Sequence, residues 1–234
     1  MFKNSKLKKR FFKIISIVII ALVTASLIIL FTIVPSFVAK RFNPVGDPEK
    51  LEVITPESQA LHQSLTIVDL HADSLLWGRD MSERSDNGHV DIPRMIEGNV
   101  ALQIFATVTK VPTPLALENN SSDSDSIIKL AILQRWSPST WFSLLERSIY
   151  QSKQLHSLQE KNPQTFRLIE TQQDLNDYLT AREKQKITAG LLSVEGAHVL
   201  EGKLQNVDRL YDAGFRIIGL SHFFDNSLTK YPIC

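Results

Sequence analysis

A histidine and an aspartate lie two residues apart where an apolar segment ends, in Asp69-Leu70-His71-Ala72-Asp73. In extended backbone, alternate residues point to the same side, so His71 and Asp73 can face one point. A neutral imidazole and a carboxylate are both normal ligands of zinc. The same spacing is also typical of a hydrogen-bonded structural pair, so the pair indicates a metal site only where further ligands converge on it.

Two more apolar segments end in side chains that could join this pair. Leu191 to Val194 leads directly into Glu195, which is followed by the small residues Gly196 and Ala197. A glutamate at the end of a buried segment is costly unless it reaches solvent, is paired or binds a metal. A later apolar segment is followed in the same way by His222. Each of these signals has an ordinary structural explanation, but all of them together favour one shared site.

The elements that must position these residues alternate between short apolar runs and longer amphipathic stretches. This alternation predicts a parallel sheet in an α/β protein, whose active sites form at the carboxyl ends of the strands. The first run is apolar and partly β-branched, as expected for a strand buried on both faces. The expected strands are Leu65–Leu70, Val100–Thr109, Thr188–Val194 and Phe215–Leu220, and the expected helices are Ser126–Glu160, Thr171–Lys184 and Leu204–Ala213.

The N-terminal segment predicts a membrane anchor. Six basic residues between Lys3 and Lys13 precede an uncharged, mostly apolar run from Ile14 to Ala39. A bilayer core of ~30 Å needs about 20 such residues as helix. The excess of positive charge before the run places the N-terminus in the cytoplasm and the body in the periplasm or outside the cell. A cleaved signal peptide is the alternative, although its apolar region is typically shorter, ~7–15 residues.

We therefore expect four parts in the chain. They are a basic cytoplasmic segment (1–13), a transmembrane signal anchor (14–39), a proline-containing linker (40–60) and an α/β body (61–234).

Composition limits the function classes. The chain has 234 residues, 43% of them hydrophobic, and a single cysteine, so disorder, an intramolecular disulfide and a cysteine-rich zinc module are excluded. The first 41 residues carry eight basic and no acidic residues, which leaves 18 basic and 25 acidic residues beyond them, a net charge of −7. A body of this sign lacks the basic surface that nucleic acid requires. The length suits one domain plus an appendage and is short for a complete eight-stranded barrel, which typically has ~250 residues.

Four segments, in this order, resemble the first half of a membrane dipeptidase (renal dipeptidase-like, peptidase family M19): VDLHADSLLWG, DIPRMIEGNVALQIFA, GLLSVEGAHVLEG and LYDAGFRIIGLSHFFDN. The resemblance covers roughly Leu65 to Leu228. It implies a (β/α)8 barrel with a two-zinc centre that hydrolyses dipeptides. Of that barrel, this chain would form about four β/α units, a partial barrel preceded by one transmembrane helix.

The resemblance also implies roles for individual residues. His71 and Asp73 match the ligands of one zinc ion, and Glu195 matches the carboxylate that bridges both ions. His222 matches the histidine that contacts the substrate, so Glu195 and His222 are the expected catalytic residues. In such centres the metal ions lower the pKa of a bridging water and polarise the peptide carbonyl. His198 receives no ligand role, and the other matching residues, Asp91, Pro93, Arg94 and Gly98, are interpreted as structural.

One departure from the family pattern concerns the later ligands. In the family, two further histidine ligands and an aspartate come from later strands, whereas this sequence ends at Cys234, soon after the fourth expected strand. His62, His89 and His156 precede or lie between the strands and cannot replace them. We therefore expect a truncated dipeptidase with weak zinc affinity and little or no activity. The family also implies a homodimer, for which no interface is visible in the sequence.

Three other interpretations remain at this stage. A different metal-dependent amidohydrolase would usually carry His-x-His on the first strand, where this chain has His71-Ala72-Asp73. A membrane-tethered remnant or binding domain without catalysis fits the early end of the sequence. The least specific interpretation is an anchored α/β domain of unknown role.

Overall fold

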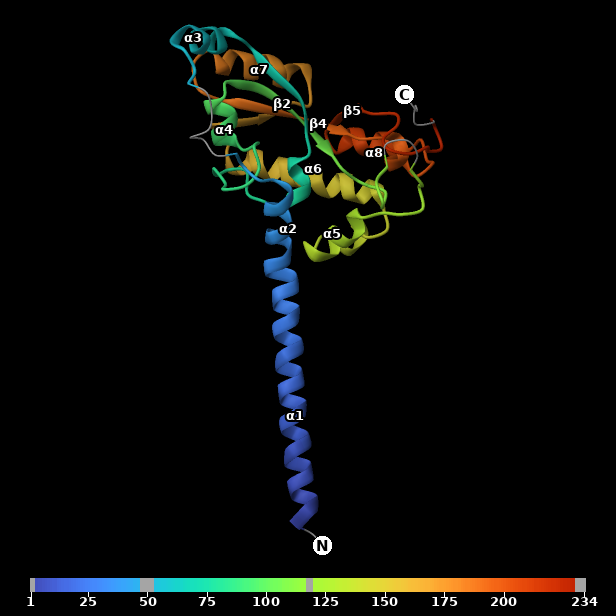
Figure 1. Ribbon diagram of the computed structural model, residues 1–234. Coiled ribbons are helices and arrows are strands. Elements are labelled where there is room, and N and C mark those ends of the chain that lie inside the picture. The colour runs from blue at the N-terminus through green and yellow to red at the C-terminus, as the bar shows by residue number, and fades with distance from the viewer. Residues whose placement is uncertain (1–2, 47–52, 117–119, 230–234) are drawn as a thin grey trace.

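A long helix leads away from an α/β body in this computed structural model, which describes residues 3–46, 53–116 and 120–229 (Figure 1). Helix α1 (Lys3–Ile28) continues through a π-helical turn, η1 (Ile29–Ile33), into α2 (Val34–Phe42). Pro35 has no N–H to donate to the preceding turn, and the Thr32 hydroxyl donates to Ile28 O at 2.6 Å, which together account for the local widening of the helix. Among the described helices, the stretch Leu7–Phe42 is the one long and apolar enough to cross a membrane by length and composition.

The C-terminal end of the long helix contacts the body directly. The Asn43 amide donates to Ala39 O at 2.8 Å, and Gly88 N donates to Asn43 O at 2.8 Å. The first residues of the expected linker are thus helical or in contact with the body, and residues 47–52 lie outside the described part. Helix α3 (Pro56–Ser64) follows, capped by the Thr55 hydroxyl, which accepts from Ser58 N.

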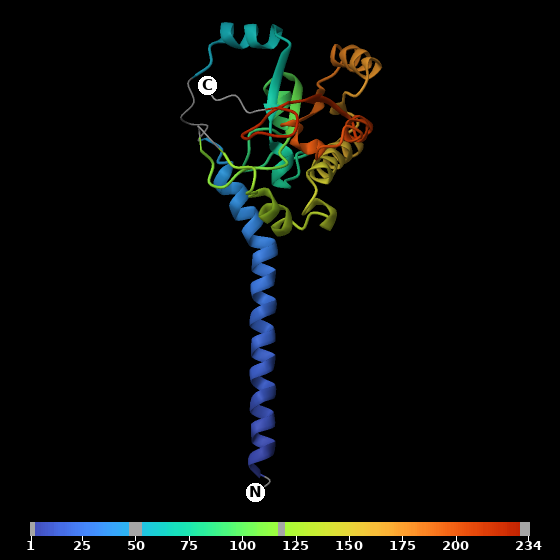
Figure 2. The ribbon, with the colours of Figure 1, turned by 90° about the vertical axis from the view of Figure 1, so that its right-hand side faces the viewer.

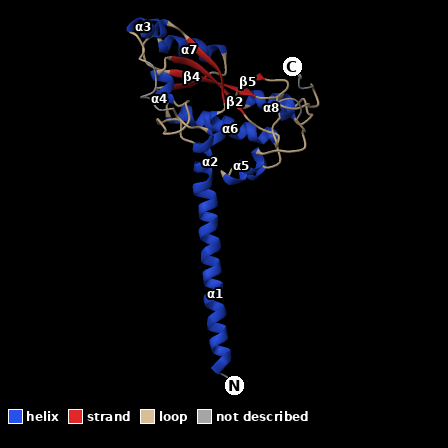
Figure 3. Cartoon of the chain, viewed as in Figure 1, coloured by secondary structure: helices blue, strands red, loops and turns tan. Residues whose placement is uncertain are grey.

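The sheet is parallel, as expected for an α/β protein. Strands β1 (Ile67–Ala72), β2 (Val100–Thr107) and β4 (Thr188–Val194) lie side by side. On the other edge of β4, β3 (Phe166–Leu168) pairs with its first half and β5 (Phe215–Ile218) with its second half. The expected fold class, a partial (β/α) barrel arrangement after one long apolar helix, is confirmed (Figures 2 and 3).

Two expectations about the strands were wrong. The short strand β3 was not foreseen, because three residues offer too little pattern to separate a strand from a loop. Strand β1 is not buried on both faces: Val68 and Leu70 are exposed. Among the described residues only β2 pairs with it, and residues 68–71, which point to alternate faces, are all exposed. Its outer edge and parts of both faces are therefore open.

The connecting segments are mostly helical, as expected, with two differences. The stretch 126–160 is broken into α5 (Ile127–Leu133), a 3-10 turn η4 (Pro138–Thr140) and α6 (Leu144–Lys161), because Arg135 takes a positive φ and Pro138 cannot continue a helix. The expected helix Leu204–Ala213 is shorter in the structure, where α8 is Asn206–Asp212, and in it Leu210 is buried while Val207 and Tyr211 are exposed. Gly214, with φ +92°, follows the C-terminal cap of α8 at Ala213.

Helices α4 (Ile92–Glu97) and α7 (Gln172–Arg182) begin with side-chain caps. Asp91 accepts from Arg94 N at 2.9 Å, which supports the structural interpretation of the Asp91-to-Gly98 segment. At α7, Thr171 and Asp174 form a complete capping box. Two further 3-10 turns, η3 (Ser74–Trp77) and η5 (Ala197–Leu200), follow the carboxyl ends of β1 and β4.

The main core lies between the sheet and helices α6 and α8. Phe105, Phe166, Leu192, Leu155 and Leu210 are completely buried there. Phe105 of β2 and Phe166 of β3, on opposite edges of β4, meet edge to face with ring centroids 6.3 Å apart. Gly190 of β4 leaves room for both rings, since a Cβ there would lie 2.6 Å from Phe166 and 3.0 Å from Phe105. This packing holds the strand ends that carry the candidate site.

Candidate metal centre

The carboxyl ends of β1, β4 and β5 meet at one edge of the sheet. His71 is the next-to-last residue of β1 and Asp73 directly follows the strand. Glu195 directly follows β4, and His222 comes four residues after β5. Because all these strands are parallel and joined through β2 and β4, their ends lie together. The structure therefore brings together all four residues that the sequence analysis selected.

The distances show one compact cluster centred on Glu195. His71 Nε2 is 2.6 Å from Glu195 Oε1 and 3.1 Å from Asp73 Oδ1. His222 Nδ1 is 3.4 Å from the other carboxylate oxygen, Glu195 Oε2. One ligand atom from each of His71, Asp73 and Glu195 can be chosen so that all three lie within 4.8 Å of one another. One imidazole and two carboxylates at this spacing could hold a divalent metal ion.

Burial and charge make this cluster favourable for a cation. The Glu195 side chain is only 9% exposed, and burial, with a contribution from the charge of Asp73, raises the pKa of Glu195 to about 7. Burial also raises the pKa of Asp73. Two carboxylates held together out of water disfavour each other's charge, and a bound cation would relieve that repulsion. Asp73 Oδ1 is also buried without a hydrogen bond of suitable geometry among the described residues, so its lone pairs are available to a metal.

His222 completes the cluster as a neutral imidazole. Burial, followed by the nearby charge of His71, lowers the pKa of His222 to about 4. A neutral ring offers one N–H donor and one acceptor, and its half-buried position leaves part of it open to a bound molecule. This geometry is compatible with the substrate contact expected for His222.

The turn after Glu195 requires glycine. Gly196 has φ +83°, and a Cβ there would lie 2.5 Å from His198 Nδ1 and 3.1 Å from His222 Cβ. The turn is further fixed to β5, since Ala197 N donates to Leu220 O at 3.1 Å and Gly219 N donates to Val194 O at 2.9 Å. Glu195 is thus held between two hydrogen-bonded strand ends.

His198 lies behind the cluster and not in it. It is 7% exposed, its Nε2 is 2.9 Å from Thr109 Oγ1, and its ring packs against Phe224 at 4.9 Å. Burial first, and then the charge of His222, lower the pKa of His198 to about 4. Sequence reasoning missed Thr109 and Phe224 as its partners. The available signal was that Thr109 ends one expected strand and Phe224 follows another, so both lie at the same edge of the sheet. The absence of a ligand role for His198 remains a prediction.

The remaining described histidines lie elsewhere. His62 Nε2 is 2.8 Å from Gly98 O, and His156 Nε2 is 3.1 Å from Glu170 Oε1. Neither residue, nor His89, belongs to the described group that could hold a metal ion.

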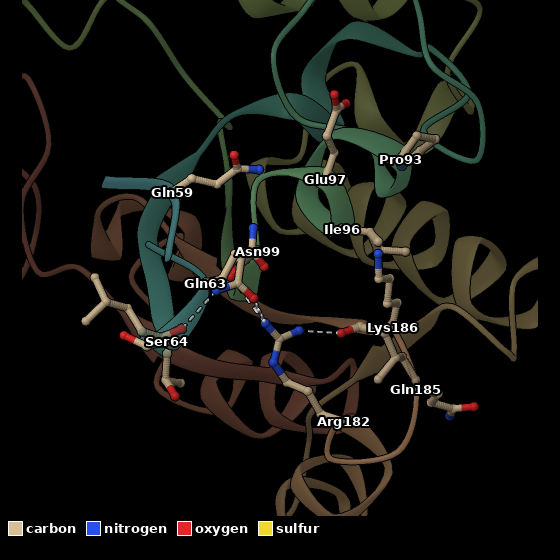
Figure 4. Close-up of a pocket in the computed structure, with 13 residues that line it drawn as sticks. Gln59, Gln63, Ser64, Pro93, Ile96, Glu97, Asn99, Arg182, Gln185 and Lys186 are labelled. Carbon is tan, nitrogen blue, oxygen red and sulfur yellow. Dashed lines mark hydrogen bonds between the residues drawn. The ribbon is translucent and has the colours of Figure 1, made fainter. Parts of the chain in front are cut away.

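A cavity of about 770 Å³ lies at the opposite end of the sheet (Figure 4). Leu65 and Thr66, Asn99 and Ile187 line it, and these residues immediately precede β1, β2 and β4. Arg182 projects into it and donates to Asn99 Oδ1 at 2.8 Å. None of the four candidate site residues lines this cavity, so it is separate from the candidate metal centre.

Comparison with known proteins decides the family. The model of the membrane dipeptidase family (peptidase family M19) matches residues 56–231, well over half of the chain. The chain belongs to the membrane dipeptidase family. No curated protein matches it significantly.

Solved structures of M19 and amidohydrolase proteins are distantly similar to this family member. Dipeptidase AC, an M19 metallopeptidase, is 18% identical (TM-score 0.45; 67% of this chain, 43% of that one). A Rhodobacter sphaeroides metallopeptidase, liganded with a phosphinate mimic of the dipeptide L-Ala-D-Ala, is 20% identical (TM-score 0.47; 67% and 45%). A Pseudomonas aeruginosa amidohydrolase is 15% identical (TM-score 0.44; 74% and 38%). The chain thus spans less than half the length of each of these structures.

Proposed function

We propose that this chain is a membrane-anchored metallo-dipeptidase, or a part of one, that binds zinc through His71, Asp73 and Glu195 and acts on dipeptides. The observation that carries the proposal is the meeting of these three ligand types, from two separate strands, within 4.8 Å of one another. Membership of the M19 family supports both the metal dependence and the dipeptide substrate.

When zinc is bound, it supplies a Lewis acid for the peptide carbonyl and a water of lowered pKa for attack on it. The chain's own residues would position these groups. Glu195, enclosed between His71 and His222, holds its two oxygens in fixed directions, so it can face the metal with one or both of them. His222, neutral at physiological pH, would donate a hydrogen bond to the substrate carbonyl oxygen and to the oxyanion that develops there. For this role its single proton must lie on the nitrogen that faces the substrate.

The described residues provide three protein ligands, whereas two zinc ions usually require more. We therefore propose weak zinc binding and low dipeptide hydrolysis for this 234-residue chain by itself. The alternative is a membrane-tethered domain without catalysis. Such a domain would have the same fold but would show no metal-dependent turnover.

The direct test combines zinc content and turnover for the full chain purified in detergent. We expect substoichiometric zinc after gel filtration, rising in zinc-containing buffer, and slow, chelator-sensitive hydrolysis of a Gly-D-Ala-type dipeptide. Glu195→Gln should abolish both, because it replaces a charged metal ligand by a neutral amide in a buried position. Glu83→Gln, the same change at an exposed site remote from the cluster, is the matched control.

Equal zinc binding by the Glu195→Gln and Glu83→Gln variants would rule out the proposed ligand set. Tight stoichiometric zinc with rapid turnover by the unaltered chain would instead contradict the proposed weakness of the centre.

We also propose that α1 anchors the chain in a membrane, with the N-terminus in the cytoplasm. The apolar run and the six basic residues before it support this orientation. Resistance to carbonate extraction, with protease access to the body only from the non-cytoplasmic side, is the expected result. Release of the body as a shorter soluble product would support the cleaved signal peptide instead.

A further inference from the structure

Helix α2 is fixed to the body by several kinds of contact. The Phe42 ring stacks on Trp77 with centroids 5.8 Å apart and planes 19° from parallel. Lys40 Nζ lies 2.6 Å from Asp86 Oδ2, and Ala39 is buried against the body. Since α1 and α2 form one continuous helix, the direction of α1 determines how the body is oriented.

The start of the apolar run indicates where a membrane would end along this helix. The run begins at Ile14, directly after Lys13. A hydrocarbon core of ~30 Å takes about 20 residues at ~1.5 Å per residue, which places its far boundary near Ile33. The headgroup layer, about 5–8 Å deep, then takes roughly the next four or five residues from Val34. The residues of α2 that contact the body, Ala39, Lys40 and Phe42, follow directly. This step depends on the anchoring proposed above.

The part of the body beside this boundary is the α5–η4 surface, defined as residues 127–142. Helix α5 lies next to α2, on the side of the body from which α1 extends, in both views (Figures 1 and 2). Gln134 and Arg135, directly after α5, line a cavity of about 360 Å³ together with Phe31 and Pro35 of the long helix. The end of α5 is therefore level with the expected membrane boundary.

The side chains of this surface suit a membrane interface. Phe142, in the turn between η4 and α6, is 86% exposed, an unusual position for a large apolar ring. Lys129 and Arg135 are exposed and form no ion pair among the described residues. Exposed aromatic rings next to cations are typical of surfaces that rest on anionic lipid.

Residues 127–142 include no aspartate or glutamate, and the exposed Asp123, four residues before α5, accepts a hydrogen bond from Ser121 Oγ at 2.9 Å. Two other acidic residues close to this surface in sequence do not cancel its positive charge. Asp125 Oδ2 is 2.6 Å from Arg147 Nη1, and Glu146 Oε1 is 2.6 Å from Arg209 Nη2. Each is already paired with a cation of its own. The free charges of the α5–η4 surface are thus positive.

We propose that the α5–η4 surface rests on the lipid bilayer that α1 spans. Phe142 enters the boundary between headgroups and acyl chains, and Lys129 and Arg135 bind anionic headgroups. The body then has two attachments, the helix and this surface, and the candidate metal centre is held at a constant orientation to the membrane.

The test places an environment-sensitive label on Phe142. The full chain with Cys234→Ser and Phe142→Cys, labelled with NBD and inserted in nanodiscs of phosphatidylcholine and phosphatidylglycerol, should show blue-shifted emission. Quenching by doxyl-labelled lipid should be several-fold stronger than for the matched control Leu61→Cys. Leu61, like Phe142, is a largely exposed apolar residue (63%), but it lies on α3, at the far end of the body in Figure 1.

Iodide in the buffer quenches labels that are exposed to water. The proposal would be overturned if the label at Phe142→Cys showed the same emission and the same iodide quenching as the label at Leu61→Cys. The same result is expected if this surface binds a protein partner, since none is present in the nanodiscs. If the chain does not remain with the nanodiscs, both the proposed anchor and the proposed lipid contact of this surface are wrong. The zinc and turnover measurements test the metal centre independently.

The basic residues are tested by charge reversal. In the labelled background, Lys129→Glu with Arg135→Glu should reduce lipid quenching at position 142 several-fold in nanodiscs that contain phosphatidylglycerol. The reduction should be smaller in pure phosphatidylcholine, because the headgroup attraction is electrostatic. Lys184→Glu with Lys186→Glu, exposed residues at the end of α7, should change nothing. Equal effects of the two pairs would show that Lys129 and Arg135 do not bind headgroups.

Discussion

Gly196 connects the candidate metal ligand Glu195 to the buried His198. Its positive φ already disfavours any residue with a Cβ, and here the Cβ would also lie 2.5 Å from His198 Nδ1. His198 has little room to move, because it is hydrogen-bonded to Thr109 and packed on Phe224. A substitution at Gly196 should therefore disturb the position of Glu195 as well as the stability of the body.

Gly196→Ala separates these effects when it is compared with Gly202→Ala. Gly202 also has a positive φ (+73°), but nothing lies within 4 Å of its added Cβ. The left-handed helical conformation costs a residue with a Cβ about 1–2 kcal/mol. Gly196, with ψ 132°, lies outside that region, so its backbone strain and the contact with His198 should together exceed the cost at Gly202. We expect a larger fall in melting temperature and in zinc binding for Gly196→Ala, followed by tryptophan fluorescence and metal titration. Equal losses in the two variants would show that neither the backbone conformation of Gly196 nor its closeness to His198 requires glycine more than position 202 does.

Among the elements, α4 depends most clearly on one carboxylate. Asp91 is completely buried, caps α4 and contacts the guanidinium groups of both Arg94 and Arg79, the latter at 3.4 Å. Helix α4 leads directly into β2, so this cap also positions the central part of the sheet. Removing one partner of a buried ion pair leaves the other charge without compensation.

Asp91→Ala should destabilise the body by roughly 3–5 kcal/mol because it leaves two arginines poorly paired. Asp174→Ala removes a comparable carboxylate from the capping box of α7, where Asp174 accepts from Thr171 N at 2.7 Å in an exposed position. Loss of an exposed cap costs about 1 kcal/mol. Thermal unfolding in detergent, followed by tryptophan fluorescence, should show the larger shift for Asp91→Ala. A shift no larger than that of Asp174→Ala would mean that the buried pair is not needed.

The sequence was informative about elements wherever a local pattern is sufficient. The expected strand Thr188–Val194 coincides with β4, and Thr171, the first residue of the expected helix, is the N-terminal cap of α7. His71, Asp73, Glu195 and His222 could be selected because the strand-end rule requires only the order of the elements. The exposure of β1 depends on which other segments cover it, and no local pattern contains that information. The pairing of Thr109 with His198 likewise joins residues 89 positions apart.

At the scale of the whole molecule, the described sheet is open. Strand β1 pairs with β2 on one edge and with no other described strand, and β5 pairs only with β4. Val68 and Leu70 on β1 and Leu220 after β5 are exposed. Free strand edges next to exposed apolar side chains favour association with another chain. The homodimer expected from the family resemblance would have its simplest physical basis here.

Self-association of the purified chain should therefore depend on β1. We expect light scattering after gel filtration in detergent to show species larger than the monomer, increasing with protein concentration. Leu70→Lys places a charge on a leucine that is 69% exposed, so it should favour the monomer without loss of folding. Leu61→Lys, a matched change on α3, controls for added charge, and both variants retain α1. If Leu70→Lys and the unaltered chain associate equally, the open edge is not the contact, and α1 becomes the element to examine because every variant shares it.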